Sequence, residues 1–231
     1  MTDHDRRALV RVLALWPLAL SAPPAWAQAA AEREGLVAPN VCLLSPETTA
    51  GPFYLDPDLV RSDITEGRPG APLALALQVV DADCRPFEGA RVDVWHCDAD
   101  GDYSGFARQG SDGVQDTRGE TFLRGTQFTD PRGVARFATI WPGWYRGRTP
   151  HGHYRNCLDE RALMTSQLFF PDGASEAVFS AAPYQARAAG QDVTNATDGI
   201  ARRAGPRSFA RVAEAGGGWE AALVVGVARA G

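Results

Sequence analysis

The stretch Pro72-Leu-Ala-Leu-Ala-Leu-Gln-Val-Val80 alternates large apolar residues with smaller or polar ones. Leu73, Leu75, Leu77 and Val79 occupy every second position. Successive side chains of a β-strand point to opposite faces, so these four residues share one face. The pattern therefore predicts a half-buried strand that turns this face toward a hydrophobic core.

Similar strand patterns recur along the chain. They are the stretches RVDVWHC (91–97), GVARFATI (133–140), TSQLFF (165–170) and GWEAALVVGVA (218–228). Between residues 40 and 170, glycines and prolines interrupt any long helical periodicity, and only SEAVFSAAPYQARAA (175–189) predicts a short helix. Short strands joined by turn-rich loops predict an all-β protein, a two-sheet β-sandwich with few short helices.

The first 27 residues have the layout of a secretory signal. Paired arginines precede an apolar run, and an Ala-Trp-Ala cleavage site follows at 25–27. The arginine pair favours the twin-arginine export route, with an ordinary Sec signal as the alternative. We therefore expect cleavage before Gln28 and a periplasmic or secreted protein with one β-sandwich domain over residues 28–231. The start of that domain, up to the first strand, is expected to be an irregular lead.

Charge and hydropathy exclude several classes of partner. The chain has 23 basic residues, all of them arginine, against 28 acidic ones, for a net charge of −5. It offers no basic stripe that would neutralise nucleic-acid phosphates. Beyond the leader, no segment approaches the roughly 20 apolar residues that span a bilayer, so we expect no membrane insertion of the mature chain. A homo-oligomer is compatible with the sequence.

Four cysteines allow three disulfide pairings in an exported protein. They are Cys42, Cys84, Cys97 and Cys157. Cys97 lies within a strand-like run, so a buried free thiol is an equally good interpretation of that residue.

The stretch RTPHGHYRN (148–156) holds two of the four histidines of the chain. On a strand, His151 and His153 would point to the same face about 7 Å apart, while Gly152 would point to the other face. Both imidazoles would then be free to bind one metal ion. Two solvated loop histidines are the alternative that this stretch alone leaves open.

Other motifs surround this histidine pair. Tyr103 follows a strand through an Asp/Gly turn, Tyr145 ends a Pro-x-x-Tyr motif, and Gln167 lies fourteen residues after His153. The chain resembles the intradiol ring-cleavage dioxygenases, and in particular their compact exported members, which use non-haem ferric iron. The resemblance rests on TAGPFYLDPDLVRSDITEG (49–67), GARVDVWHCDADGDYSGF (89–106), FLRGTQFTDPRGVARFATIWPGWYRGR (122–148) and HGH (151–153).

The resemblance implies an Fe(III) site and a reaction. The implied iron ligands are Tyr103, Tyr145, His151 and His153. Two phenolates are hard anions that suit a trivalent ion, and metal binding should weaken at low pH as these ligands take up protons. By the same resemblance, a catechol-type diol is cleaved by O2 between its hydroxyl-bearing carbons to a cis,cis-muconate-type dicarboxylate, without an organic cofactor.

Three residues would take part in catalysis by this resemblance. Tyr145 would accept a proton from the diol, Arg148 would stabilise negative charge that develops on the ring, and Gln167 would orient a neighbouring group. Candidates for lining the substrate pocket are Tyr54, Arg61 and Asp63.

The sequence departs from the family pattern near the histidines. Gly152 stands where a bulky aliphatic residue is usual, and residues 154–167 are largely polar. These features predict a short or frayed strand around His153 and weaker iron binding. Ala50 stands where an acidic residue is common.

Two other functions remain open on the sequence alone. His96, His151 and His153 would suit a three-histidine zinc enzyme, although His96 lies on an apolar strand face and is better explained as a core histidine. A non-catalytic β-sandwich binding module, with Trp141, Trp144 and Tyr145 as its ligand platform, is the second alternative.

Overall fold

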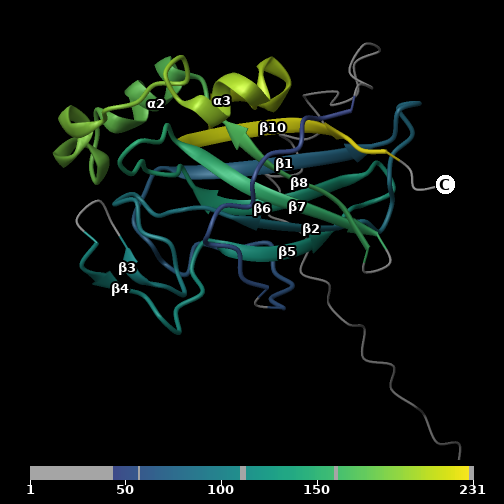
Figure 1. The fold of residues 1–231 in the computed structure, drawn as a ribbon, viewed down its shortest axis with the longest axis horizontal. Helices are drawn as coiled ribbons and strands as arrows, with labels where there is room; N and C mark the ends of the chain where they lie inside the picture. The colour runs from purple at the N-terminus through teal and green to yellow at the C-terminus, as the bar shows by residue number, and fades with distance from the viewer. Residues whose placement is uncertain (1–43, 57, 110–112, 159–160, 229–231) are drawn as a thin grey trace, which may run out of the picture.

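The computed structural model describes residues 44–56, 58–109, 113–158 and 161–228. Two four-stranded sheets form a sandwich, with helices at one end (Figure 1). The β1 sheet has the strand order β6 (Val134–Ile140), β1 (Pro72–Val80), β10 (Gly218–Gly226), β9 (Arg211–Ala215). The β7 sheet has the order β5 (Arg124–Phe128), β2 (Arg91–Trp95), β7 (His151–Leu158), β8 (Arg161–Phe169). The predicted all-β sandwich is confirmed.

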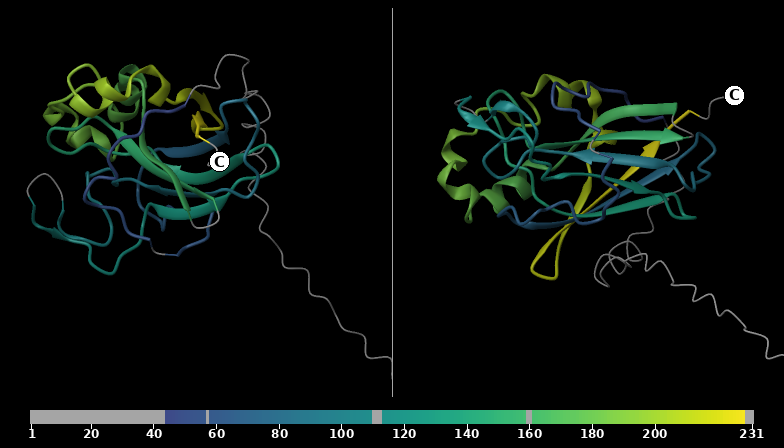
Figure 2. Two further views of the ribbon diagram at one scale, coloured as in Figure 1. Left: turned by 45° about the vertical axis from the view of Figure 1, so that its right-hand side comes forward. Right: turned by 90° about the horizontal axis from the view of Figure 1, so that it is seen from below.

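The remaining elements gather at one end of the sandwich. They are α2 (Asp172–Phe179), α3 (Gly199–Ala204), three 3-10 turns (Tyr184–Ala186, Ala188–Gly190 and Pro206–Ser208) and the hairpin of β3 (Ala107–Gln109) and β4 (Gln115–Asp116). Both ribbon views show α2 and α3 at the end of the sandwich from which the β3–β4 hairpin projects (Figures 1 and 2).

The core lies between the two sheets, and β1 supplies it as its alternation predicts. Leu73, Leu75, Leu77 and Val79 are at most 3% exposed. They belong to one apolar cluster with residues of the β7 sheet such as Val92. Burial of each such side chain stabilises the fold by about 1.5–3 kcal/mol, so this face anchors the β1 sheet.

The strand around His153 is longer and better paired than its sequence predicts. β7 runs for eight residues between β2 and β8 and is antiparallel to both. Although many of its side chains are polar, neighbours on both sides pair with its backbone groups along its length. A Cβ added at Gly152 would meet Leu168 at 3.4 Å, an ordinary contact, so Leu168 already fills the space beside this glycine. The expectation of a short or frayed strand is wrong.

The predicted helix over 175–189 is also partly wrong. α2 ends at Phe179, and the rest of the predicted range contains only single 3-10 turns. Pro183 falls inside the predicted helix, and a proline has no N–H for the helical hydrogen bond. The strands β5 and β9 were not predicted.

The cysteines divide between the two expected roles. Cys84 is disulfide-bonded, and Cys97 and Cys157 are buried free thiols. Cys42 and the leader over residues 1–27 lie outside the described residues. Within the described ranges, no helix is long and apolar enough to cross a membrane.

Candidate metal centre

Two phenol oxygens and two imidazole nitrogens meet on the outer face of the β7 sheet. The hydroxyl oxygen of Tyr103 lies 3.4 Å from Nε2 of His151 and 3.2 Å from Nε2 of His153. The hydroxyl oxygen of Tyr145 lies 3.2 Å from Nε2 of His151. The four side chains that the sequence suggested as metal ligands are therefore brought together around one point.

The fold explains this convergence. His151 and His153 alternate with Gly152 and Tyr154 along β7, and Tyr154 belongs to the core cluster. The two histidines thus point away from the core. Tyr103 follows β2 after a tight turn in which the carboxylate of Asp98 accepts hydrogen bonds from two backbone N–H groups. This turn brings the chain back over the sheet.

Hydrogen bonding and packing orient the two imidazoles. Nδ1 of His151 donates to the backbone oxygen of Thr149 at 2.7 Å, because a carbonyl oxygen only accepts. Nε2 of His151 therefore carries the lone pair that faces the phenols. The ring of His153 stacks on Trp95, with centroids 5.0 Å apart and an interplanar angle of 10°. Gly51 has φ +66° and packs closely against the imidazole of His153. A Cβ added to Gly51 would lie 3.2 Å from Cε1 of that ring.

Tyr103 is held by its backbone and by its ring. Its N–H donates to Oε1 of Gln109 at 3.1 Å, and its carbonyl accepts from the hydroxyl of Thr117 at 2.6 Å. Both partners come from the β3–β4 region. The ring of Phe53 stacks on the Tyr103 ring, with centroids 4.5 Å apart. A phenol fixed in this way needs little reordering to bind an ion.

The electrostatics of the cluster favour a bound cation. Burial, together with the charge of Arg148, lowers the pKa of His151 to about 3, and burial lowers the pKa of His153 well below its ordinary value. Burial raises the pKa of Tyr145 to about 12 and that of Tyr103 well above 10. The imidazoles are therefore neutral with free lone pairs, and the phenols ionise only if a positive ion compensates them.

The donor separations fit a single metal ion. Nitrogen and oxygen ligands bind metals at about 2.0–2.2 Å, which sets neighbouring ligand atoms roughly 2.8–3.6 Å apart. The observed separations of 3.2–3.4 Å lie within this range. A set of two phenols and two imidazoles is a hard oxygen and nitrogen donor set that suits ferric iron better than a soft metal.

Arg148 and Gln167 adjoin the cluster. One terminal nitrogen of Arg148 donates to the hydroxyl of Tyr145 at 3.3 Å, and the other donates to Oε1 of Gln167 at 2.6 Å. Gln167 is fully buried and donates to the backbone oxygen of Thr49 at 2.9 Å. Both predicted residues thus touch the candidate centre or its immediate neighbours, and Gln167 acts on Arg148.

The geometry removes the zinc alternative. Nδ1 of His96 lies 2.8 Å from the backbone oxygen of Cys97, and Nε2 lies 2.7 Å from the hydroxyl of Thr139. Burial lowers the pKa of His96 to about 4. His96 is a satisfied core histidine, as expected. No group of three or more His, Cys, Asp or Glu side chains in the described part of the chain is arranged to hold a metal.

The aromatic-platform alternative also loses its basis. Trp141 is fully buried and Trp144 is 8% exposed, and both belong to the core cluster. Trp144 lies under the guanidinium of Arg187, 4.5 Å from the ring centroid. These indole rings are structural rather than ligand-facing.

The three candidates for the pocket lining make contacts outside the four proposed ligands. Tyr54 packs edge-on against Trp95, the ring on which His153 stacks, and donates to the carboxylate of Asp93. Arg61 donates to backbone oxygens of Thr121 and Arg124. Asp63 accepts from Thr65 within a local turn. The polar contacts of Arg61 and Asp63 thus serve loop structure rather than the cluster.

Asp198 is the residue near the centre that sequence reasoning missed. Its buried carboxylate accepts from Nε of Arg148 at 2.8 Å across fifty positions of sequence. The available sequence signal was an aspartate that opens a helical stretch, since Asp198 caps α3. A capping pattern predicts a helix start but not its distant partner.

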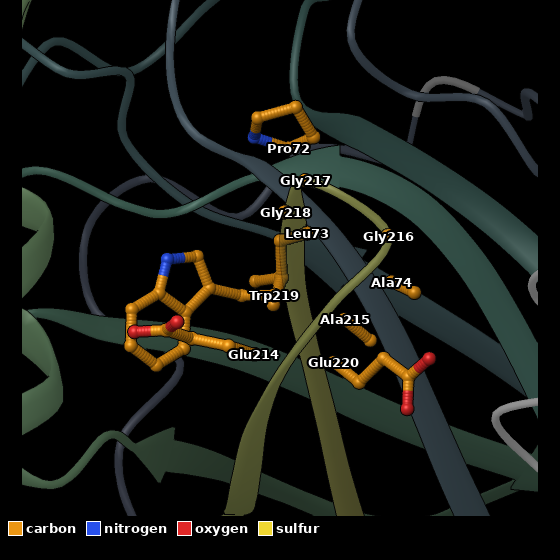
Figure 3. Close-up of a pocket in the computed structure, with 10 residues that line it drawn as sticks. All are labelled: Pro72, Leu73, Ala74, Glu214, Ala215, Gly216, Gly217, Gly218, Trp219 and Glu220. Atoms are coloured by element: carbon orange, nitrogen blue, oxygen red, sulfur yellow. The ribbon is translucent and has the colours of Figure 1, made fainter.

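The groove drawn in Figure 3 lies away from the candidate metal centre. It has a volume of about 430 Å³ and is lined by the start of β1 and by the β9–β10 hairpin (Figure 3). None of its lining residues is one of the four proposed ligands, Tyr103, Tyr145, His151 and His153. Trp219 in this groove packs edge-on against Trp141 of the core.

Comparison with known proteins identifies the family of this chain. The dioxygenase family model matches residues 45–171, more than half of the chain. Catechol 1,2-dioxygenase of Acinetobacter baylyi is 31% identical over 121 residues, which cover 50% of this chain and 37% of that protein. The matched part thus spans little more than a third of the curated relatives' length.

Two solved structures extend the likeness. An intradiol ring-cleavage dioxygenase from Tetranychus urticae has a TM-score of 0.74 and 34% identity, over 81% of this chain and 95% of that one. The dioxygenase domain of a carbohydrate-binding fusion protein from Streptomyces sp. SirexAA-E has a TM-score of 0.61 and 28% identity, over 81% of this chain and 100% of that one. The chain belongs to the intradiol ring-cleavage dioxygenase family.

Proposed function

We propose that this protein cleaves a catechol-type diol with O2, between the two hydroxyl-bearing carbons, at a ferric ion held by Tyr103, Tyr145, His151 and His153. The product would be a cis,cis-muconate-type dicarboxylate. The observation that carries the proposal is the meeting of two phenol oxygens and two imidazole nitrogens at separations of 3.2–3.4 Å. When bound, ferric iron would supply the Lewis acidity that makes the diol ring reactive toward O2.

The protein environment would prepare these ligands. The depressed pKa values of both histidines keep their lone pairs available at neutral pH. The β7 pairing and the Trp95 stack hold the imidazoles, while Gln109 and Thr117 hold the backbone of Tyr103. Burial of Tyr103, His151 and His153 shields their donor atoms from water, which strengthens electrostatic interactions there.

Tyr145 and Arg148 are suited to act on the substrate. Tyr145 is less buried than Tyr103, so its oxygen is the more accessible of the two. As a phenolate beside a bound cation, it could take a proton from a diol hydroxyl and become a neutral phenol. The guanidinium of Arg148 already lies beside that oxygen and carries a planar, delocalised positive charge. It would stabilise negative charge on the diol ring in the transition state.

Oxygen consumption tests the proposal. Purified, iron-loaded protein should consume O2 with at least one diol of a panel of catechol, protocatechuate, hydroxyquinol and larger plant-derived catechols, and should form a ring-opened dicarboxylate. Tyr145→Phe should abolish this reaction and His153→Ala should lower it by about 10³-fold, while the exposed-surface variant Glu214→Gln should retain it. Iron-loaded protein that consumes no O2 with any diol of the panel would contradict the proposal.

We further propose that the protein is exported. The arginine pair, apolar run and Ala-Trp-Ala site over residues 1–27 support a cleaved leader, and the disulfide at Cys84 suits an oxidising compartment. Amino-terminal sequencing of protein from fractionated bacteria should give a chain that starts at Gln28 in the periplasm or medium. Recovery of an uncleaved chain in the cytoplasm alone would contradict export.

A further inference from the structure

The segment 192–198 lies against the short loop that carries Arg148. It contacts three consecutive loop residues. The N–H of residue 147 donates to the carboxylate of Asp192 at 3.1 Å, and the hydroxyl of Thr149 donates to Oδ1 of Asn195, also at 3.1 Å. Between them, Arg148 is bound by Asp198. The segment follows the part of the chain that the family model matches, residues 45–171.

Asp198 divides its two oxygens between two tasks. Oδ1 accepts from the N–H groups of Ile200 and Ala201 at 2.7 and 3.1 Å and so caps α3. Oδ2 accepts from Nε of Arg148 at 2.8 Å and from the N–H of Thr149 at 3.1 Å. The residue is 1% exposed, so this charge-assisted contact is shielded from solvent and stronger than a surface ion pair.

This contact fixes the direction of the guanidinium. The group is planar, so binding its Nε edge to Asp198 leaves the two terminal nitrogens free to point the other way. They donate to the hydroxyl of Tyr145 and to Oε1 of Gln167. Without the carboxylate, the Nε edge would lose its charged partner, and a flexible side chain would have to be ordered by the remaining contacts alone.

We infer that Asp198 is a positioning residue for the proposed reaction, which acts by holding Arg148 in its working direction. The inference rests on the proposed function for its catalytic consequence, but the contact itself can be measured without turnover. The inference adds the N-terminus of α3, where Asp198 is the capping residue, to the surroundings of the proposed active site.

The variant Asp198→Asn isolates the interaction. Asparagine is as good a helix cap as aspartate, so Oδ1 can still accept from α3. The amide nitrogen that replaces Oδ2 is a donor and would face the N–H groups of Arg148 and Thr149. The change therefore keeps size and cap but removes the acceptor. Ala201→Gly, which weakens α3 without touching Arg148, controls for a general loss of helix stability.

The kinetic test is a double-mutant cycle. A displacement of about 1 Å can cost about 100-fold in rate, so Asp198→Asn should lower kcat/KM by about 10- to 100-fold at unchanged iron content, whereas Ala201→Gly should not. In an Arg148→Ala background, Asp198→Asn should have no further effect, because its target is gone. An equal loss in both backgrounds would overturn the inference.

A second measurement is independent of catalysis. The Nε–H of Arg148, assigned by its loss in Arg148→Lys, should exchange slowly with solvent in the wild type and rapidly in Asp198→Asn. Slow exchange that survives Asp198→Asn would overturn the inference even if the enzyme were active. If the wild type cleaves no diol yet shows this protection, the proposed function fails while the contact between Asp198 and Arg148 stands.

Discussion

The strands β1 and β7 occupy central positions in their sheets but are built on different principles. β1 turns Leu73, Leu75, Leu77 and Val79 to the core, and burial alone explains its place. β7 is buried on both faces, yet its outer face carries the polar side chains of the candidate centre. The β1 sheet therefore contributes mainly stability, whereas the outer face of β7 contributes chemistry.

The largest expected effect comes from removing a proposed metal ligand from β7. His153→Ala should lower iron content and reduce diol cleavage by about 10³-fold, because metal-ion catalysis supplies several kcal/mol and each 1.36 kcal/mol is a factor of ten. Its unfolding midpoint should change little in the metal-free state. Conversion of the satisfied core histidine, His96→Gln, should lower stability while the folded fraction still binds iron. Iron analysis and thermal unfolding of both variants separate the two roles, and equal iron loss in both would contradict this assignment.

A core substitution in β1 should give the opposite result. Leu77→Ala should lower the free energy of unfolding by about 2–5 kcal/mol through lost burial and a cavity. Iron bound per folded chain should be unchanged. Denaturant unfolding measures the first quantity, and metal analysis of the folded protein measures the second. Loss of iron from chains that remain folded would show that the two sheets are not separable in this way.

The two glycines near the histidines give a matched pair of smaller changes. Gly51→Ala should cost about 1–2 kcal/mol in stability, because Gly51 has φ +66° and a left-handed conformation penalises a Cβ. It should also speed iron release, since the new Cβ would press on His153. Gly152→Ala should be nearly neutral, because its Cβ would only touch Leu168. Iron release to a chelator, measured for both variants, would contradict the account if Gly152→Ala were the more damaging.

The smallest expected effect is a pH dependence of stability at Asp198. The ion pair with Arg148 and the cap of α3 lower the pKa of Asp198, although burial opposes them. A depressed folded pKa means that the stabilisation is fully present above the unfolded value of about 3.9 and is lost as pH falls through the lower folded value. The difference in unfolding midpoint between the metal-free wild type and Asp198→Asn should hold from pH 7 to about 5 and shrink below about 4. A difference that stays constant to pH 3 would contradict this origin.

The contrast between β1 and β7 also explains which features of the fold the sequence pattern predicts. Alternation identified β1 because an apolar face with period two is a direct record of burial. The same rule misjudged β7, where polar residues such as Asn156 are fully buried in the sandwich. Pairing to two neighbouring strands, which no local pattern records, determines the length of β7.

The candidate centre could be predicted only in part from the sequence, for a related reason. The spacing of His151 and His153 is local, so the strand period alone predicts that they share a face. Tyr103 and Tyr145 were suggested by resemblance to a family, and only the folded chain brings their hydroxyls to the histidines. Asp198 escaped prediction because its partner is fifty residues away. Residue type and hydrophobic periodicity report local structure and do not identify long-range contacts of this kind.

The most direct test of the shared metal site is the visible spectrum of purified, iron-supplemented protein together with its iron content. The account predicts one ferric ion per chain and a wine-red tyrosinate-to-iron charge-transfer band, weakened in Tyr145→Phe and absent in His153→Ala. Colourless protein that retains no iron after supplementation, or a band unchanged in Tyr145→Phe, would contradict the binding of one ion by these four side chains.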